Sequence, residues 1–178
     1  MSVLRPVLFL DFDGVLVHQA HADDWIDDFG PAFDVEKSAY IAALQHQTNC
    51  RIVVISSWRN RAEQGLPAMQ RMAKERGLDW TIDDTVVLRN DPQAATLGNR
   101  SSEIDHWLAS QPGKDIGHIA ILDDSMRVPY FSPHHYDVHV QPFWSGITQK
   151  DYEMTLHLLK NGPEPALRQR PAPTAPRP

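Results

Sequence analysis

The stretch VLFLDFDGVL at residues 7–16 is an apolar run broken by two carboxylates one residue apart, Asp11 and Asp13. A short, continuous apolar run is typical of a strand that is buried on both faces of a parallel sheet. Residues two apart in a strand point the same way, so we expect both carboxylates on one side of the strand's carboxyl end. Open parallel sheets bind their ligands at that edge. The stretch therefore predicts both a parallel sheet and the place of a ligand site.

Two further apolar runs end in polar side chains in the same way. The run IVVI leads into Ser56 and Ser57, and the run IAIL leads into Asp123 and Asp124. If these strands lie parallel to the first, the ends meet at one edge, which then carries at least three carboxylates. At a separation of about 4 Å and an effective dielectric near 20, each like-charged pair costs on the order of 4 kcal/mol. Such a cluster must be protonated or neutralised by a cation.

We expect this cation to be Mg²⁺. The chain has 1 cysteine, and no histidine falls within the three strand ends, so the ligand set that zinc prefers is missing there. Ligation by oxygen alone, with room for water, favours Mg²⁺.

Length and composition fit one α/β domain. The chain has 178 residues, of which 42% are hydrophobic, enough for a sizeable core but too few residues for two full domains. No run approaches the roughly 18 to 20 apolar residues that cross a bilayer, and the apolar run before Asp11 is too short for a signal-peptide core. We therefore expect a cytoplasmic protein without a membrane contact. The net charge of −6 argues against a uniformly basic nucleic-acid surface, and Cys50 is expected to be a packed thiol.

Strand and helix patterns alternate along the chain, which is typical of a doubly wound, mostly parallel sheet with helices on both faces. Further strands are expected at residues 85–88 and 138–140. Helices are expected after an Asp34 cap, from Pro67 to Gly77, from a cap at Ser101 or Ser102, and from Thr148 to Gly162.

The predicted domain spans residues 1–161, and a Pro-rich tail follows at residues 162–178. The tail has almost nothing to bury, so we expect it to be disordered. The acidic segment at residues 23–28 is expected to form a solvated loop or a short helix.

The order and spacing of these motifs resemble the four motifs of the haloacid dehalogenase-like (HAD) phosphohydrolases over roughly residues 7–151. Shorter matches, SSWR at residues 56–59 and WSGIT at residues 144–148, resemble a branch found in RNA repair proteins. The resemblance implies a Rossmann-like fold. Because residues 17–50 offer a loop and one helix, and residues 89–99 only a connector, we expect no large cap domain.

The resemblance also implies a phosphatase, a phosphoric monoester hydrolase, in which Asp11 attacks phosphorus and forms an aspartyl-phosphate. Asp13 would act as the general acid and then as the general base. The Mg²⁺ ligands would be the Asp11 carboxylate, the Asp13 backbone carbonyl and Asp123, with Asp124 binding directly or through water.

Ser56 would donate a hydrogen bond to a phosphoryl oxygen, and Arg100 would supply positive charge to the equatorial oxygens. Two assignments stay open, because Ser57 competes with Ser56, and Arg89 competes with Arg100, where the family more often has lysine. Further candidates for substrate contact are Gly14, Ser57 and Arg59.

A site without a cap favours a large substrate whose phosphate is reached at an end. We therefore expect a phosphate monoester on a nucleotide or on a nucleic-acid end, with a small-metabolite phosphatase as the alternative. A receiver-like phosphoacceptor module would also use clustered aspartates and Mg²⁺, but its acceptor ordinarily follows a later strand. An inactive scaffold is a further alternative, although the polar set looks complete.

Overall fold

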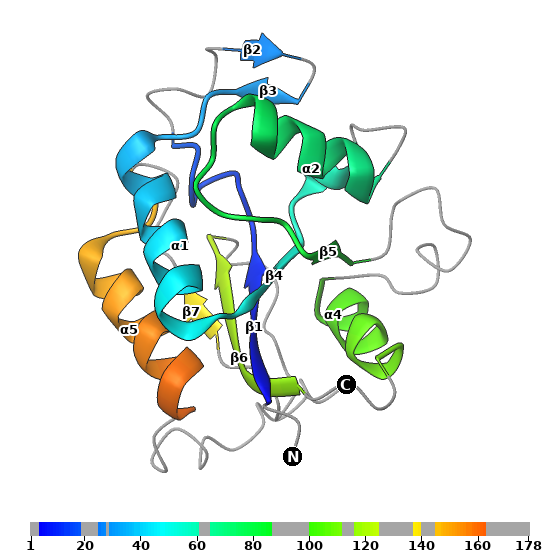
Figure 1. The fold of residues 1–178 in the computed structure, drawn as a ribbon, viewed down its shortest axis with the longest axis vertical. Coiled ribbons are helices and arrows are strands. Elements are labelled where there is room, and N and C mark those ends of the chain that lie inside the picture. Colours follow the sequence, from blue (N-terminus) through cyan, green and yellow to red (C-terminus); the bar gives the residue numbers. More distant parts are fainter. Residues whose placement is uncertain are drawn as a thin grey trace, which may run out of the picture.

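The computed structural model describes residues 4–18, 25–27, 29–60, 65–86, 100–111, 116–124, 137–139 and 145–162 of the 178-residue chain. Within these ranges a parallel sheet lies between two layers of helices, as Figure 1 shows. No helix in these ranges has both the length and the apolar character to span a bilayer.

The sheet has five strands in the order β5-β4-β1-β6-β7, and every neighbouring pair is parallel. The strands are β1 (Arg5–Leu10), β4 (Arg51–Val54), β5 (Asp84–Thr85), β6 (Ile116–Asp123) and β7 (Asp137–His139). The strand that carries the opening motif is thus the central one, which confirms the predicted doubly wound α/β fold. The strand expected at residues 85–88 begins one residue earlier, and residues 87 and 88 lie outside the described ranges.

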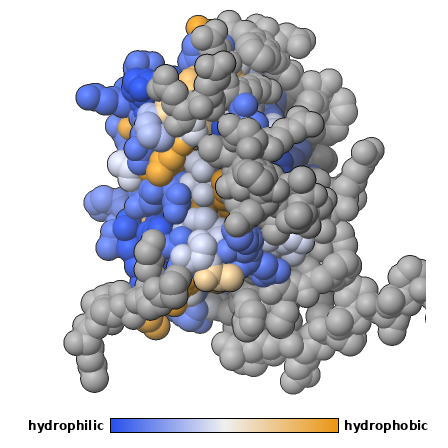
Figure 2. Space-filling view, turned by 90° about the vertical axis from the view of Figure 1, so that its right-hand side faces the viewer, coloured by the Kyte–Doolittle hydropathy of each residue, from blue (hydrophilic) through white to orange (hydrophobic). Residues whose placement is uncertain are grey.

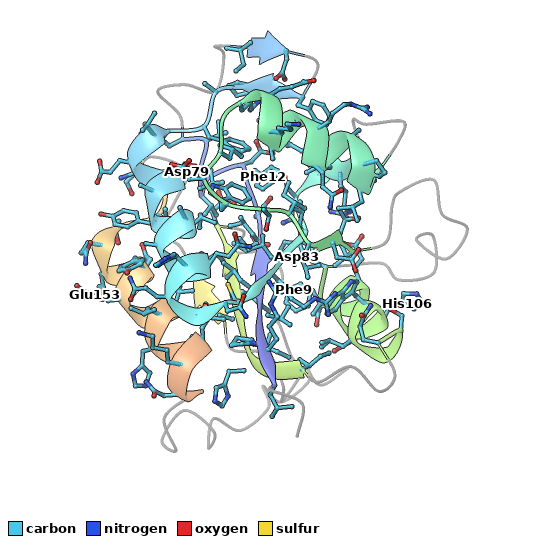
Figure 3. All side chains as sticks on the ribbon, viewed as in Figure 1. Phe9, Phe12, Asp79, Asp83, His106 and Glu153 are labelled. Carbon is cyan, nitrogen blue, oxygen red and sulfur yellow. The ribbon has the colours of Figure 1, made fainter. Side chains whose placement is uncertain are left out.

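Burial on both faces explains why residues 7–10 of β1 are all apolar. Leu8 and Leu10 join a large core under α1 (Val35–Thr48), α2 (Leu66–Glu75) and α5 (Gln149–Asn161). Phe9 faces the opposite way and meets Trp107 of α4 (Arg100–Ala109) edge to face, with the ring centroids 5.3 Å apart. Figure 3 shows Phe9 between the sheet and α4, and Phe12 higher in the molecule.

Local capping explains where two of the helices begin. The side chain of Asp34 accepts the N–H groups of Glu36 and Lys37 at the start of α1, and Thr148 forms a capping box with Asp151 at the start of α5. Both N-caps are confirmed. The helix α4 was predicted, but its predicted N-cap was wrong, because Ser101 and Ser102 lie inside the helix.

Of the acidic segment, residues 25–27 are described, and they form a strand and not a loop or helix, which corrects the prediction for that part. β2 (Trp25–Asp27) pairs antiparallel with β3 (Gly30–Pro31). The carboxylate of Asp27 accepts the N–H of Phe29 at 2.8 Å within the turn and pairs with Arg76 at 2.6 Å. In Figure 1 this hairpin lies beyond the carboxyl ends of the strands, beside α2.

Three smaller expectations have different outcomes. Cys50 is fully buried, as expected, and burial raises the pKa of its thiol. The final helix ends at Asn161 with Gly162 as its C-cap, as expected. Residues 163–178 lie outside the described ranges, so the disordered tail and the domain boundary remain predictions. On the face in Figure 2, the described residues are mostly hydrophilic, and hydrophobic ones form small separate patches.

Candidate active site

Asp11 and Asp123 are neighbours because their strands pair in parallel register. Leu10 is opposite Leu122, and the N–H of Asp11 donates to the carbonyl of Leu122 at 2.9 Å. One carboxylate oxygen each from Asp11, Asp123 and Asp124 lies within 4.8 Å of the others. The strand ends therefore bring the predicted carboxylates together.

Ser56 reaches the same edge from the other neighbour of β1. Its strand is anchored where the N–H of Ile55 donates to the carbonyl of Leu10 at 2.9 Å. Ser56 is fully buried and its Oγ accepts the N–H of Trp58 at 3.3 Å. Ser57 is exposed and begins the short 3-10 helix η2 (Ser57–Asn60). Both serines stay candidates for the phosphate contact.

Two of the carboxyl groups at this edge, those of Asp11 and Asp124, have raised pKa values. Burial raises the pKa of Asp11 from 3.8 to about 7, while Arg100 lowers it and the charge of Asp123 raises it further. Burial, followed by the charge of Asp123, also raises the pKa of Asp124. Both shifts show that the cluster needs positive charge to remain ionised.

Arg100 supplies part of that charge. Its Nη1 donates to Oδ2 of Asp11 at 2.5 Å and to Oδ2 of Asp123 at 2.9 Å. The side chain comes from the first turn of α4 and is 23% exposed, so a phosphoryl group bound beside Asp11 can approach it. The competing Arg89 lies outside the described residues.

The donor set fits a hard divalent cation, because all three converging side chains offer carboxylate oxygen. Gly14 makes this arrangement possible. A Cβ at Gly14 would lie 2.0 Å from Oδ2 of Asp124, and the backbone there has a φ of +73°, which favours glycine. Gly14 was predicted to contact the substrate, and its position gives it the further task of making room for Asp124.

Asp13 lies in the turn that follows β1, and its carboxylate is not one of the three that converge. The turn is closed by the N–H of Gly14, which donates to the carbonyl of Val17 at 2.7 Å. The indole Nε1 of Trp58 donates to Oδ1 of Asp13 at 2.9 Å. The side chain of Asp13 is thus held by Trp58 and is not a member of the group of three converging carboxylates.

Arg59 lies beside the site and is bound by its neighbours, and its contact with substrate remains a prediction. It is only 5% exposed, and its Nη1 donates to the backbone carbonyls of Ile55 and Ser56. Its Nη2 pairs with Glu103 of α4 at 2.7 Å. Arg59 therefore ties the strand end that carries Ser56 to the helix that carries Arg100.

Sequence reasoning missed the polar function of Trp58 and the pairing of Glu103. The motif SSWR and the spacing of Glu103 from Arg100 were visible. Nothing in the sequence distinguishes Trp58 from a tryptophan that only packs, and Trp58 is indeed fully buried. The two hydrogen bonds could not be derived, because each joins residues more than 40 positions apart.

Comparison with known proteins agrees with this geometry. Among curated proteins, no sequence matches the chain closely enough to identify a relative. The match that is found covers nearly all of the sheet, the helices α1, α2 and α4, the start of α5, the three strand-end motifs and Arg100. It is a family model described as the HAD domain in Swiss Army Knife RNA repair proteins, which matches residues 7–152, and the chain therefore belongs to this family of HAD-type hydrolase domains.

Proposed function

We propose that this HAD-type domain is a Mg²⁺-dependent phosphomonoesterase that acts through an aspartyl-phosphate on a nucleotide or on the end of a nucleic acid. The observation that carries the proposal is the convergence of Asp11, Asp123 and Asp124 within 4.8 Å, with Arg100 bound to two of them. A structural ion pair also brings a carboxylate close to a cation, but one carboxylate is enough for that purpose. Three carboxylates beside one arginine at a strand edge are more than a structural ion pair needs.

In the proposed reaction an oxygen of Asp11 attacks phosphorus, and the bond from phosphorus to the ester oxygen breaks. Asp13 gives its proton to the departing oxygen. Water then attacks the aspartyl-phosphate and loses a proton to Asp13, and inorganic phosphate leaves with Asp11 restored. The two aspartates therefore have separate tasks, in keeping with their separate surroundings.

Electrostatics favour this division of labour. Asp11 must be ionised to attack, and Arg100 favours its charged form against the effect of burial. Arg100 can also stabilise the charge that develops on the phosphoryl oxygens. When bound, Mg²⁺ would be held by Asp11, Asp123 and Asp124 and would supply further positive charge to the phosphoryl group.

The substrate class rests on two supports. The family takes its name from RNA repair proteins, and the described part of the chain between β1 and β4 contains a turn, the β2–β3 hairpin and α1, but no added domain. A site without a large cap can accept a phosphate at the end of a long chain. We therefore expect terminal phosphates of nucleic acids to be cleaved faster than sugar phosphates.

A substrate screen tests the proposal. The purified chain would be given Mg²⁺ and RNA or DNA with a 3′ or 5′ phosphate, mononucleotides, or sugar phosphates, and phosphate release would be measured. Asp11→Asn should abolish release from every substrate, whereas Asp79→Asn, at an exposed position, should not. Activity that survives Asp11→Asn would overturn the mechanism. A long-lived phosphoprotein after treatment with acetyl phosphate would favour the receiver-like alternative.

A further inference from the structure

Trp58 makes a polar contact that ordinary core packing does not require. It is fully buried, yet its indole Nε1 donates to Oδ1 of the part-buried Asp13 at 2.9 Å. The two residues lie on different elements, Asp13 in the turn after β1 and Trp58 in η2. The contact therefore connects the predicted acid to a rigid part of the core.

The indole is held in place from several sides. Phe12 meets it edge to face with the ring centroids 5.6 Å apart, and Phe33 lies against it at 5.4 Å. The guanidinium of Arg76 lies 5.3 Å from the centre of the Trp58 ring, and Arg76 is itself bound to Asp27. Aromatic and cation–π contacts of this kind restrict a side chain to one orientation.

An indole N–H can only donate a hydrogen bond. The oxygen that receives it must therefore offer a lone pair, whether Asp13 is ionised or protonated. When Asp13 carries a proton, the carbonyl oxygen of the carboxyl group is a better acceptor than its hydroxyl oxygen, so the indole favours Oδ1 as the carbonyl and the proton on Oδ2. The geometry thus distinguishes two oxygens that are chemically equivalent in an isolated carboxyl group.

We propose that Trp58 is a positioning residue that keeps Oδ1 of Asp13 as an acceptor and so presents the transferable proton on Oδ2. This inference rests on the proposed phosphatase function. In the first half of the reaction, Oδ2 gives its proton to the ester oxygen as the bond to phosphorus breaks. In the second half, Oδ2 receives the proton of the attacking water.

The test uses Trp58→Phe, which keeps an aromatic ring and removes the N–H. If the proton is no longer held on Oδ2 of Asp13, cleavage should slow for a substrate with a poor leaving group. It should not slow for a substrate whose leaving group departs without a proton. In single-turnover experiments, which follow release of the leaving group and so report the first half of the reaction alone, we expect the rate for a nucleotide phosphate ester to fall about tenfold, a part of the 10² to 10⁴ that general acids contribute. For p-nitrophenyl phosphate we expect less than about a twofold change, because its leaving group needs no proton.

Trp107→Phe is a matched control. Trp107 is also buried, and its Nε1 donates to Oδ2 of Asp84 at 2.9 Å, in a pair that belongs to α4 and β5. The substitution Trp107→Phe removes an indole N–H from a comparable hydrogen-bonded pair of tryptophan and aspartate that does not include Asp13. Both variants should have similar melting temperatures, and Trp107→Phe should not distinguish the two substrates.

A double variant tests the coupling directly. Once Asp13→Asn has removed the acid, adding Trp58→Phe should lower the single-turnover rate no further. Equal losses on both substrates, or a further loss in the double variant, would overturn the role of Trp58. If instead Asp11→Asn retained full activity, the proposed function itself would fail, so the two failures are distinguishable.

A second measurement leaves Trp58 unchanged and so does not depend on the stability of the Phe variant. In ¹H–¹⁵N spectra, the indole N–H of Trp58 should shift upfield and exchange faster when Asp13→Ala removes its acceptor. The indole N–H of Trp107 should remain unchanged. If the indole resonance of Trp58 were the same in Asp13→Ala as in the wild type, the hydrogen bond and the proposal would both be contradicted.

Discussion

Oδ2 of Asp11 and Nη1 of Arg100 lie 2.5 Å apart, although the residues are separated by 89 positions in the sequence. The same nitrogen lies 2.9 Å from Oδ2 of Asp123. A charge-assisted hydrogen bond of this kind is about twice as strong as one between neutral groups. The guanidinium therefore fixes the proposed nucleophile and a proposed metal ligand relative to each other.

Arg100→Met should lower kcat/KM by roughly 10²- to 10³-fold, because it removes a donor that also stabilises the transferring phosphoryl group. Arg100→Lys should retain more activity, since it keeps the charge but loses the planar fork. Steady-state kinetics with the best substrate of the screen provide the measurement. Arg71→Met, at an exposed position on α2, is the control. Unchanged kinetics in Arg100→Met would refute the role of this residue.

Mg²⁺ should raise the melting temperature of the protein, because an ion that binds only the native state stabilises it. The site gathers three carboxylates, and the cation relieves their mutual repulsion. Asp123→Asn should abolish most of this Mg²⁺-dependent shift, whereas Glu153→Gln, at an exposed position on α5, should preserve it. The melting temperature is measured by thermal unfolding in EDTA and at increasing concentrations of Mg²⁺. A shift of equal size in Asp123→Asn would place the ion elsewhere.

Gly14→Ala should weaken Mg²⁺ binding through Asp124. The new Cβ would lie 2.0 Å from Oδ2 of Asp124, whereas a Cβ at Gly77 would meet nothing within 4 Å. The φ angles are similar, +73° and +67°, so both variants carry the left-handed backbone cost of roughly 1 to 2 kcal/mol. Only Gly14→Ala should also reduce Mg²⁺ affinity in calorimetric titration. Equal affinity in the two variants would show that Asp124 does not need this space.

Asp34→Ala should destabilise the protein by about 1 kcal/mol, because it removes the N-cap of α1. Burial raises the pKa of Asp34, but the hydrogen bonds from His18 and from the N–H groups of Lys37 and Glu36 outweigh it and hold the pKa below 3.8. The native pKa is thus depressed. The stabilisation is fully present above pH 3.8 and is lost as the pH falls through the native pKa.

Asp34→Asn separates the cap from the charge, because the amide still accepts hydrogen bonds but does not titrate. Below pH 3.8, the wild type should lose stability relative to Asp34→Asn. Urea unfolding at pH values between about 3 and 7 measures the difference. Parallel pH dependence in the two proteins would show that the Asp34 carboxylate contributes nothing through its charge.

The sequence was most informative about β1, because the apolar residues of this strand are enough to predict that it is buried on both faces. Residues 7–10 are apolar without interruption because β1 is central and buried on both faces, and parallel pairing then brings Asp11 and Asp123 together without any further information. Arg100 was predicted at a helix start, and the structure connects it to both of these aspartates.

The sequence was least informative where a partner is distant. Acidic residues near Asp27 suggested a solvated loop or short helix, and residues 26 and 27 are exposed, but residues 25–27 form a hairpin strand in which Asp27 binds Arg76, 49 positions away. Arg59 was named only as a candidate for substrate contact, and the sequence pattern gave no sign that it is buried. Its burial depends on Glu103, 44 positions away. Local sequence patterns do not reveal ion pairs between residues that lie so far apart in the chain.

Arg76 also joins parts of the molecule that are distant in sequence. It binds the carboxylate of Asp27 and the carbonyls of Gly30 and Pro31, and its guanidinium lies over Trp58, whose N–H holds Asp13. The hairpin and the acid thus share one support. Displacing the hairpin from α2 would therefore remove a contact that holds Trp58, and through Trp58 it would weaken the support of Asp13.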